Sequence, residues 1–218
     1  MQTSNNHKIR TIALYVCLFD FILSVSCFKR PTEPPQQSEK YLNRIDPLYS
    51  IHFVNEKTGW VVGEEGLISK TTDGGTTWVN QNSGTEAQLK SVFFIDENNG
   101  WAVGQHYSDK AIYKTTDGGI NWRELSTGLF SWLDLRSVYF TNESTGWIAG
   151  NNGIIINTTD QGLTWSTQIN MPDCVVFEDI FFIDINTGWA VGHYWDYERR
   201  GIILKTTDGS NSWITLKE

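Results

Sequence analysis

The chain contains 218 residues, of which 39% are hydrophobic and 13% aromatic, and it carries a formal net charge of −8 at pH 7. This acidic balance argues against nucleic acid as a partner, because binding to the phosphate backbone depends on clustered Lys and Arg side chains. Of the three cysteines, Cys17 and Cys27 lie near the N-terminus and Cys174 stands alone in the rest of the chain, which excludes an internal disulfide there.

Residues 1–27 have the layout of an export signal. The polar start contains Lys8 and Arg10, and residues 11–26 are mostly apolar. The apolar run is short for a transmembrane helix, and Asp20 inside it would cost about 2.5 to 3.5 kcal/mol at the centre of a membrane. We therefore expect the segment to direct export and then to be cleaved.

The end of this signal carries a possible lipidation site. The sequence Leu-Ser-Val-Ser-Cys, ending at Cys27, resembles a bacterial lipobox. The resemblance implies that Cys27 is lipidated and holds the exported chain on a membrane of the cell envelope or periplasm. Simple secretion after cleavage near Ser26 and retention as an uncleaved anchor are the alternatives.

Residues 28–47 are predicted to form a tether. This stretch is polar and rich in proline, with the sequence KRPTEPPQQSEK. Such a composition cannot bury a hydrophobic core and stays extended. It separates the signal from the folded part of the chain.

Residues 48–218 contain two short sequences that each occur four times. The tryptophans of the first, Trp60, Trp101, Trp147 and Trp189, are 41, 46 and 42 residues apart. This period suits a unit of four short strands, as in a propeller blade. Helical repeats are disfavoured because Gly, Asp, Asn and Thr recur inside every unit. The first sequence is Gly-Trp-x-x-Gly, and the second comprises TTDGGTTW (Thr71–Trp78), TTDGGINW (Thr115–Trp122), TTDQGLTW (Thr158–Trp165) and TTDGSNSW (Thr206–Trp213).

The pattern predicts an all-β fold, a β-propeller of four-stranded antiparallel blades with four repeats. The first strand of a blade is an apolar run, and runs of this length suit strands covered on both faces. The second strand holds the Gly-Trp sequence, and the Thr-Thr-Asp turn joins the third strand to the fourth. The expected first strands are Val92–Ile95, Val138–Phe140 and Ile180–Ile183, and the expected third strands are Gly66–Lys70, Ala111–Lys114, Gly153–Asn157 and Gly201–Lys205.

The residues of the repeated turn have clear local roles. An Asp side chain can accept hydrogen bonds from backbone N–H groups one or two residues further on, and Gly adopts positive φ without strain. The Trp that follows is expected to bury its ring beside the turn. One carboxylate per turn is too few for a calcium loop, so we predict a structural role, with no metal and no cofactor. The turn residues are Asp73, Trp78, Asp117, Trp122, Asp160, Trp165, Asp208 and Trp213.

These turns resemble Asp-boxes, the Ser/Thr-x-Asp-x-Gly-x-Thr-Trp repeat of BNR-repeat propellers. Together with the Gly-Trp sequence, the resemblance is closest to the photosystem II assembly-factor propellers and their bacterial relatives. Asn121 and Ser212 depart from the pattern by replacing Thr, and Ser210 replaces Gly. The resemblance implies a non-catalytic, exported propeller that binds a protein partner or assists the assembly of an envelope or membrane complex.

Neuraminidases share the Asp-box, so carbohydrate binding or sialidase-like glycoside hydrolysis is the alternative function. Sialidase chemistry requires three Arg side chains around a carboxylate. Such a triad is hard to assemble here, and we expect no enzyme, although a glycosidase of another kind needs only two facing carboxylates. The arginines after the signal are Arg30, Arg44, Arg123, Arg136, Arg199 and Arg200.

The number of repeats leaves the arrangement open. The resembling families usually have six to eight blades. Three arrangements fit the sequence: a closed ring of four blades, an open arc that pairs with another chain, and a fragment of a longer protein. We favour an incomplete or open ring, whose exposed blade faces need a partner.

Variation between repeats collects in the loops opposite the Asp-boxes, which join strands two to three and strand four to the next blade. Exposed aromatic side chains and Arg on such loops are typical of protein recognition, and aromatic rings can also stack on a glycan. The alternative is that they cover the end of a blade. Cys174, beside Val175, is expected to be a small buried hydrophobic residue. The candidate binding residues are His106, Tyr107, Phe130, Trp132, His193, Tyr194, Trp195, Tyr197, Arg199 and Arg200.

Overall fold

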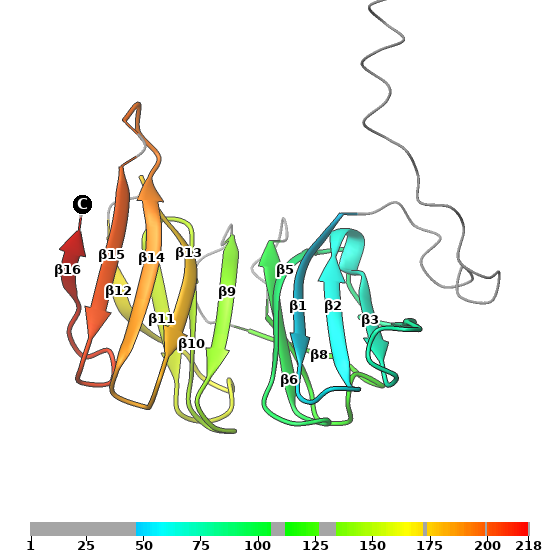
Figure 1. Cartoon of the computed structure of the whole chain (residues 1–218). Coiled ribbons are helices and arrows are strands. Elements are labelled where there is room, and N and C mark those ends of the chain that lie inside the picture. Colours follow the sequence, from blue (N-terminus) through cyan, green and yellow to red (C-terminus); the bar gives the residue numbers. More distant parts are fainter. Residues whose placement is uncertain (1–46, 106–111, 127–133, 172–173, 199, 218) are drawn as a thin grey trace, which may run out of the picture. The chain divides into compact units, whose positions relative to one another are not determined.

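The computed structural model describes residues 47–105, 112–126, 134–171, 174–198 and 200–217 (Figure 1). The chain divides into two units, residues 1–38 and 39–218, and every described residue belongs to the second. Within the described residues, no helix is long and apolar enough to cross a membrane. Several predicted features lie outside the described residues: the export signal with Cys27, the tether apart from Pro47, and His106, Tyr107, Phe130, Trp132 and Arg199.

The described residues form sixteen strands in four antiparallel sheets, and each sheet contains four strands in chain order. This confirms the predicted all-β fold with four-stranded blades. The first sheet contains β1 (Leu48–Phe53), β2 (Gly59–Gly63), β3 (Ile68–Thr71) and β4 (Val79–Gln81), with a 3₁₀ turn, η1 (Glu64–Gly66), between β2 and β3. The second contains β5 (Gln88–Phe94), β6 (Gly100–Gln105), β7 (Ile112–Thr115) and β8 (Arg123–Leu125). The third contains β9 (Leu135–Phe140), β10 (Gly146–Gly150), β11 (Ile154–Thr158) and β12 (Ser166–Asn170), and the fourth β13 (Val175–Phe182), β14 (Gly188–Tyr194), β15 (Gly201–Thr206) and β16 (Ile214–Lys217).

The first strands of the blades differ from the prediction in length and in burial. They begin before the apolar runs, at Gln88 rather than Val92 in β5 for example. A β-bulge interrupts each of them, because its pairing with the second strand shifts by one residue. Burial alternates on both sides of the bulge, as in β5, where Leu89, Val92 and Phe94 are buried and their neighbours only partly so. A search for apolar runs does not detect the full length of such a strand, because the bulge interrupts its alternation of buried and exposed residues.

The Asp-box turns are closed by a repeated set of hydrogen bonds. In the first turn, Oδ1 of Asp73 accepts from the backbone N–H of Thr77 at 2.9 Å and Oδ2 from its hydroxyl at 2.7 Å. The hydroxyl of Thr71 donates to Asp73 and accepts from the N–H of Gly75. The carboxylate therefore bonds four residues further on, not one or two as expected, because two residues in the left-handed conformation, Gly74 and Gly75, curl the chain around it.

The departures from the Asp-box pattern leave this geometry intact. Asn121 donates its amide N–H to Asp117 at 2.8 Å, and the hydroxyl of Ser212 donates to Asp208 at 2.6 Å. Both side chains replace the Thr hydroxyl as donors. Ser210 takes the left-handed conformation that Gly takes in the other turns, with φ of 72°.

The Asp-boxes lie on the same rim of the blades as the turns between the first and second strands, as predicted. In the first blade the N–H of Gly74 donates to the carbonyl of Lys57, and in the second Gly118 donates to Asn98. Gln161 and Gly209 make the same bond in the third and fourth blades. The described residues of the variable loops, such as 193–198, consequently lie on the opposite rim.

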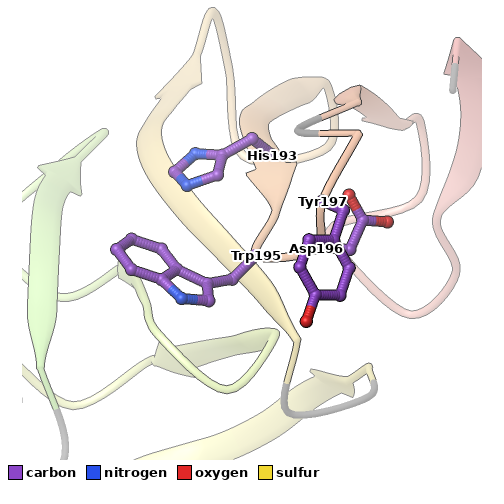
Figure 2. Close-up of a pocket in the computed structure, with 4 residues that line it drawn as sticks. All are labelled: His193, Trp195, Asp196 and Tyr197. Carbon is purple, nitrogen blue, oxygen red and sulfur yellow. The ribbon is translucent and has the colours of Figure 1, made fainter.

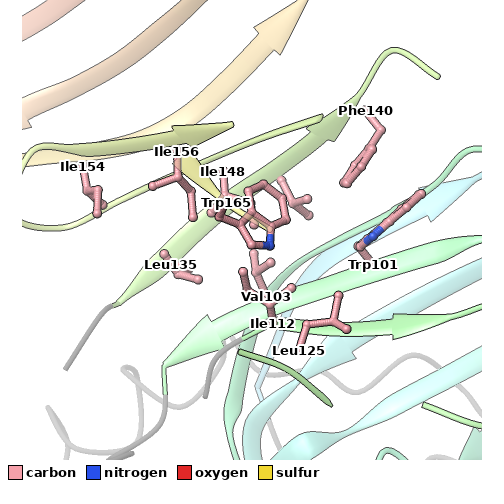
Figure 3. Packing of buried hydrophobic residues seen from close by; sticks show 11 residues of the cluster. Trp101, Val103, Ile112, Leu125, Leu135, Phe140, Ile148, Ile154, Ile156 and Trp165 are labelled. Atoms are coloured by element: carbon pink, nitrogen blue, oxygen red, sulfur yellow. The ribbon is translucent and has the colours of Figure 1, made fainter. Parts of the chain in front are cut away.

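Successive blades pack through large aromatic side chains. The cluster between the second and third sheets contains Trp101 and Phe140, whose rings stack with centroids 3.6 Å apart (Figure 3). A Cβ at Gly146 would collide with the Phe140 ring, so the Gly of the Gly-Trp sequence makes room for this packing. The Asp-box tryptophans are less buried than expected. Among them Trp165 is buried, whereas Trp78, Trp122 and Trp213 remain partly exposed.

Candidate functional site

The hairpin between β14 and β15 projects from the variable rim (Figure 1). At its base the N–H of Tyr194 donates to the carbonyl of Arg200 at 2.9 Å, and the N–H of Trp195 donates to the carbonyl of Cys174. Within the tip, Oδ1 of Asp196 accepts from the N–H of Glu198 at 3.0 Å, which forms a turn. These bonds fix the backbone that carries the aromatic side chains.

The hairpin borders a cavity of about 420 Å³ that is lined by His193, Trp195, Asp196 and Tyr197 (Figure 2). The rings of His193 and Trp195 lie with centroids 6.0 Å apart and tilted by 40°. Trp195 is 69% exposed and Tyr197 is fully exposed, so neither ring is used to fill the core. Large rings held at the surface lose little conformational entropy on binding, which suits them to recognise a partner.

Arg200 stabilises the hairpin rather than pointing freely into solvent. Its guanidinium lies 4.7 Å from the centre of the Tyr194 ring and pairs with Asp196 at 3.2 Å and with Glu198 at 3.3 Å. The hydrogen bond to Asp196 raises the pKa of Arg200. Arg200 thus connects Tyr194 with Asp196 and Glu198, the residues on either side of Trp195 and Tyr197 in the hairpin.

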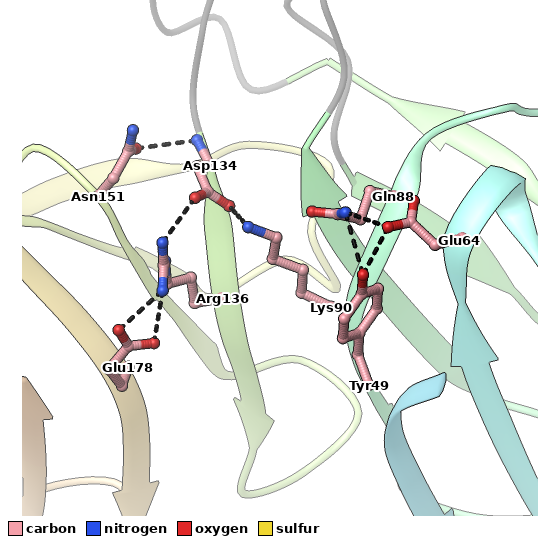
Figure 4. Close-up of polar contacts among 8 residues, drawn as sticks. All are labelled: Tyr49, Glu64, Gln88, Lys90, Asp134, Arg136, Asn151 and Glu178. Atoms are coloured by element: carbon pink, nitrogen blue, oxygen red, sulfur yellow. Dashed lines mark hydrogen bonds and ion pairs between the residues drawn. The ribbon is translucent and has the colours of Figure 1, made fainter. Parts of the chain in front are cut away.

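A chain of charged side chains connects three blades on the same rim (Figure 4). Asp134, which is buried, pairs with Lys90 at 2.6 Å and with Arg136 at 3.0 Å. Arg136 forms two 2.7 Å bonds to the carboxylate of Glu178, which lies 3.5 Å from His193 of the cavity. Burial opposes the charge of Arg136, but the bonds from Glu178 and the charge of Asp134 outweigh it and raise the pKa of the guanidinium. The network therefore ties the cavity wall to the second and third blades.

This charged network was missed by the sequence analysis. The first strand of each blade has one extra residue at its bulge. This residue directly follows the one that pairs with the last Gly of the Gly-Trp-x-x-Gly sequence. In the four blades it is Tyr49, Lys90, Arg136 and Glu178. A bulge turns its extra residue away from the regular alternation. Alignment of the four first strands on this position would have revealed the set. Tyr49 belongs to a neighbouring cluster, in which its hydroxyl and the amide of Gln88 both donate to Glu64 (Figure 4).

Of the ten candidate binding residues, the structure brings together His193, Trp195 and Tyr197 at the cavity, and Tyr194 and Arg200 contact each other in the same hairpin. The other five lie outside the described residues. The expectation for Cys174 was wrong: this residue is exposed. It ends the loop before β13, and burial begins only with Val175.

The described residues that line the cavity include one carboxylate. Asp196 is the carboxylate among the residues that line it, and this side chain already pairs with Arg200. Glycoside hydrolysis needs two carboxyl groups about 5 to 9.5 Å apart. In the described part of the chain, no three His, Cys, Asp or Glu side chains are grouped so that they could hold a metal ion.

Comparison with known proteins supports the fold. Residues 81–173 match the model of a family described as photosynthesis system II assembly factor YCF48, and comparison with curated proteins gives no match. The structure of YCF48 bound to a D1 peptide is 16% identical, with a TM-score of 0.54 over 81% of this chain and 84% of that one.

Two glycoside hydrolase structures share the fold as well. The GH74 enzyme of Niastella koreensis is 16% identical, with a TM-score of 0.60 over 78% of this chain and 30% of that one. The GH74 xyloglucanase from Xanthomonas campestris is 13% identical, with a TM-score of 0.56 over 73% of this chain and 28% of that one. The chain thus spans less than a third of these enzymes. Its fold is that of a β-propeller, and residues 81–173, less than half of the chain, match the model of the YCF48 assembly-factor family.

Proposed function

We propose that the chain is a non-catalytic binding protein that takes a segment of a protein partner at the cavity beside the β14–β15 hairpin. The observation that carries the proposal is the pair of exposed rings, Trp195 and Tyr197, held over a cavity of about 420 Å³. The relative with a bound D1 peptide supports it, since a propeller of the same fold accepts a peptide. Assistance in assembling an envelope or membrane complex follows as the biological role.

The proposed partner segment is short and carries an aromatic or aliphatic side chain. A cavity of this size accepts one large side chain and its flanking backbone. The His193 and Trp195 rings offer apolar contact, while the Asp196 carboxylate and the Tyr197 hydroxyl offer hydrogen bonds to backbone N–H groups. Rings with a few polar groups around them are the usual composition of a binding hot spot.

The site predicts a specific loss of binding. The tagged full chain is used to capture proteins from the solubilised membranes of its host, and the captured proteins are quantified by mass spectrometry. Replacing Trp195 and Tyr197 by Ala should lower capture of the specific partner at least about tenfold, because loss of a hot-spot ring commonly costs 2 kcal/mol or more. Synthetic peptides that tile the partner then locate the segment bound.

A matched control removes exposed apolar side chains from the opposite rim. Ile120 and Leu163 are 75% and 58% exposed and lie in the second and third Asp-boxes. The Ile120→Ala, Leu163→Ala variant should capture as much partner as the unmodified chain. Equal capture by the Trp195→Ala, Tyr197→Ala variant would contradict the proposed site.

The proposal includes export of the chain and its attachment to a membrane through a lipid on Cys27. The support is the signal-like sequence of residues 1–27. Intact mass of the mature protein tests this point. A mature chain that begins at Cys27 and carries acyl mass is expected, whereas an unmodified start at Cys27 or a retained Met1 would contradict it.

Carbohydrate binding is the second candidate function. The GH74 neighbours favour it, together with the exposed rings of Trp195 and Tyr197, which can stack on a sugar. Calorimetry with xyloglucan oligosaccharides separates the two functions. Binding that depends on Trp195 would support the carbohydrate function, and release of reducing sugar by the purified chain would replace the non-catalytic proposal with a glycosidase.

A further inference from the structure

The three joints between successive blades repeat one set of aromatic contacts. We call the side of each sheet that meets the next sheet its forward face, and the side that meets the preceding sheet its rear face. A Trp of the second strand on the forward face stacks on a Phe of the first strand on the next rear face. The ring centroids are 3.5 Å apart for Trp60 and Phe94, 3.6 Å for Trp101 and Phe140, and 3.6 Å for Trp147 and Phe182.

The joints also repeat their polar contacts. The indole N–H of Trp60 donates to the carbonyl of Gly118 in the next Asp-box at 3.3 Å. Trp101 donates to the carbonyl of Gln161 in the third Asp-box at 3.2 Å, and Trp147 donates to the hydroxyl of Ser210 in the fourth at 3.0 Å. Nearer the first strands, the hydroxyls of Ser50, Ser91 and Ser137 accept hydrogen bonds from the backbone N–H groups of Val92, Val138 and Ile180.

The rear face of the first sheet presents the same kind of side chains without this cover. Leu48, Ile51 and Phe53 are 48%, 59% and 38% exposed. At the same register in the other three sheets, the side chains are buried, with 0 to 4% of their surface exposed. Three apolar side chains at interface positions are therefore open to solvent. Their buried equivalents are Leu89, Leu135 and Phe177, then Val92, Val138 and Ile180, and finally Phe94, Phe140 and Phe182.

The forward face of the fourth sheet is the complementary half of a joint. Trp189 is partly exposed, and Lys205 lies 5.4 Å from its ring, as Lys70 and Lys114 lie over Trp60 and Trp101. Val191 is 41% exposed, whereas Val62, Val103 and Ala149 at the same register are fully buried.

One aromatic side chain from the first strand of each blade contacts the next, and this series has no further aromatic partner after Phe181 in the described chain. His52 contacts Phe93 with centroids 4.6 Å apart, Phe93 contacts Tyr139 at 5.1 Å, and Tyr139 contacts Phe181 at 5.0 Å. Phe181, the last member, is 49% exposed. A second His52 is the group that the repeat would place against it.

We propose that the forward face of the fourth sheet docks on the rear face of the first sheet of a second copy of this chain. Trp189 of one copy stacks on Phe53 of the other, its indole N–H donates to the carbonyl of Gly74, and Phe181 meets His52. The contact is heterologous, so each copy uses two different faces, and two such contacts can close a ring of two copies.

Two features of the chain favour a second copy as the occupant. The two exposed faces match each other in the ring pair, the Asp-box acceptor and the aliphatic side chains that the internal joints use. Residues 28–46 contain Phe28, Tyr41, Leu42 and Ile45 but no Trp that could stack on Phe53 as Trp60 stacks on Phe94.

The mass of the full chain in solution tests the proposal by light scattering and sedimentation at concentrations from about 1 to 100 μM. We expect the unmodified chain to form a dimer. Ile51→Glu breaks the rear face and Val191→Glu breaks the forward face, so each variant alone should be monomeric, with association weakened about 100-fold or more. A 1:1 mixture of the two variants should form a heterodimer that is weaker than the unmodified dimer, because one contact joins the two intact faces and the other joins the two substituted faces.

Controls and contrary outcomes separate this contact from others. Ile120→Glu adds the same charge at an exposed position outside both faces and should leave the dimer unchanged. Circular dichroism verifies that each variant keeps its β-structure. An unmodified chain that stays monomeric at every concentration would overturn the proposal. This outcome is also expected if the first and fourth sheets of one chain pack against each other. A dimer that survives both substitutions, or two variants that do not recombine, would also overturn it.

Discussion

The four Asp-box carboxylates couple the stability of the fold to pH. Bonds to the charged form lower the pKa of each: the Thr77 hydroxyl bonds Asp73, the Asn121 N–H bonds Asp117, the Thr164 hydroxyl bonds Asp160 and the Ser212 hydroxyl bonds Asp208. A carboxylate with a lowered pKa in the folded state contributes stability that is present above its unfolded pKa, about 3.9, and is lost as the pH falls through the folded value. His52 acts in the same direction at higher pH, because burial lowers its pKa below the usual value near 6.5.

We therefore predict a melting temperature that declines slightly below pH 6.5 and steeply below about pH 4. Asp160→Asn isolates one turn, since the amide cannot ionise and its nitrogen cannot accept a hydrogen bond, whereas both carboxylate oxygens of Asp160 accept bonds. The variant should melt at a lower temperature than the unmodified chain at pH 7, and the two melting temperatures should converge towards pH 3. A difference that stays constant from pH 7 to pH 3 would show that the charge of Asp160 contributes nothing.

At the scale of the strand, the side chains of the bulge residues Lys90, Arg136 and Glu178 form ion pairs from one blade to the next. Arg136→Met keeps the apolar stem but removes the guanidinium, which leaves the buried Asp134 with Lys90 as its remaining cationic partner. The Arg136 side chain is 25% exposed, so we expect a loss of about 1 to 3 kcal/mol, below that for a fully buried pair. Urea unfolding measures it. Arg136→Lys should lose part of this amount, since one ammonium cannot replace both Nη1, which bonds Glu178, and Nη2, which bonds Asp134.

The exposed Arg123 supplies the control for this prediction. Arg123→Met removes the same charge from the chain and should change the free energy of unfolding by about 0.5 kcal/mol or less. Equal losses for the two variants would mean that the network contributes no more than the general charge balance of the domain.

The turns were the most predictable elements, and the bulges the least. Asp73, the glycines after it and Thr77 make contacts within five residues, so the sequence of the turn determines its conformation. A bulge exists only relative to the paired strand, and the position of Arg136 depends on Gly150 in β10. The contacts of the cavity residues have the same dependence on distant segments: Trp195 bonds Cys174 across the loop before β13. The sequence analysis therefore identified the hairpin residues without the network that supports them.

At the scale of the whole molecule, the repeats predicted the blades but not their closure. Each joint uses residues from two blades, such as Trp101 and Phe140, and nothing within one repeat states how many repeats a ring contains. The exposure of Ile51 and Val191 carries this information, because it identifies the two interface halves that no blade of the described chain covers. The exposed fractions of these two side chains are known only from the folded structure, so the sequence could not predict whether the ring closes.

If two copies close the ring, stability becomes a property of concentration. Dimers of this kind unfold with dissociation, so a tenfold increase in concentration stabilises the pair by about 1.4 kcal/mol, or about 0.7 kcal/mol for each chain. For a domain of this size that corresponds to a rise of about 1.5 to 3 °C in melting temperature. We predict a rise of about 3 to 6 °C between 1 and 100 μM, and no rise for Ile51→Glu, whose remaining intact face has no counterpart. A melting temperature of the unmodified chain that is independent of concentration would contradict the pairing of Trp189 with Phe53 of a second copy.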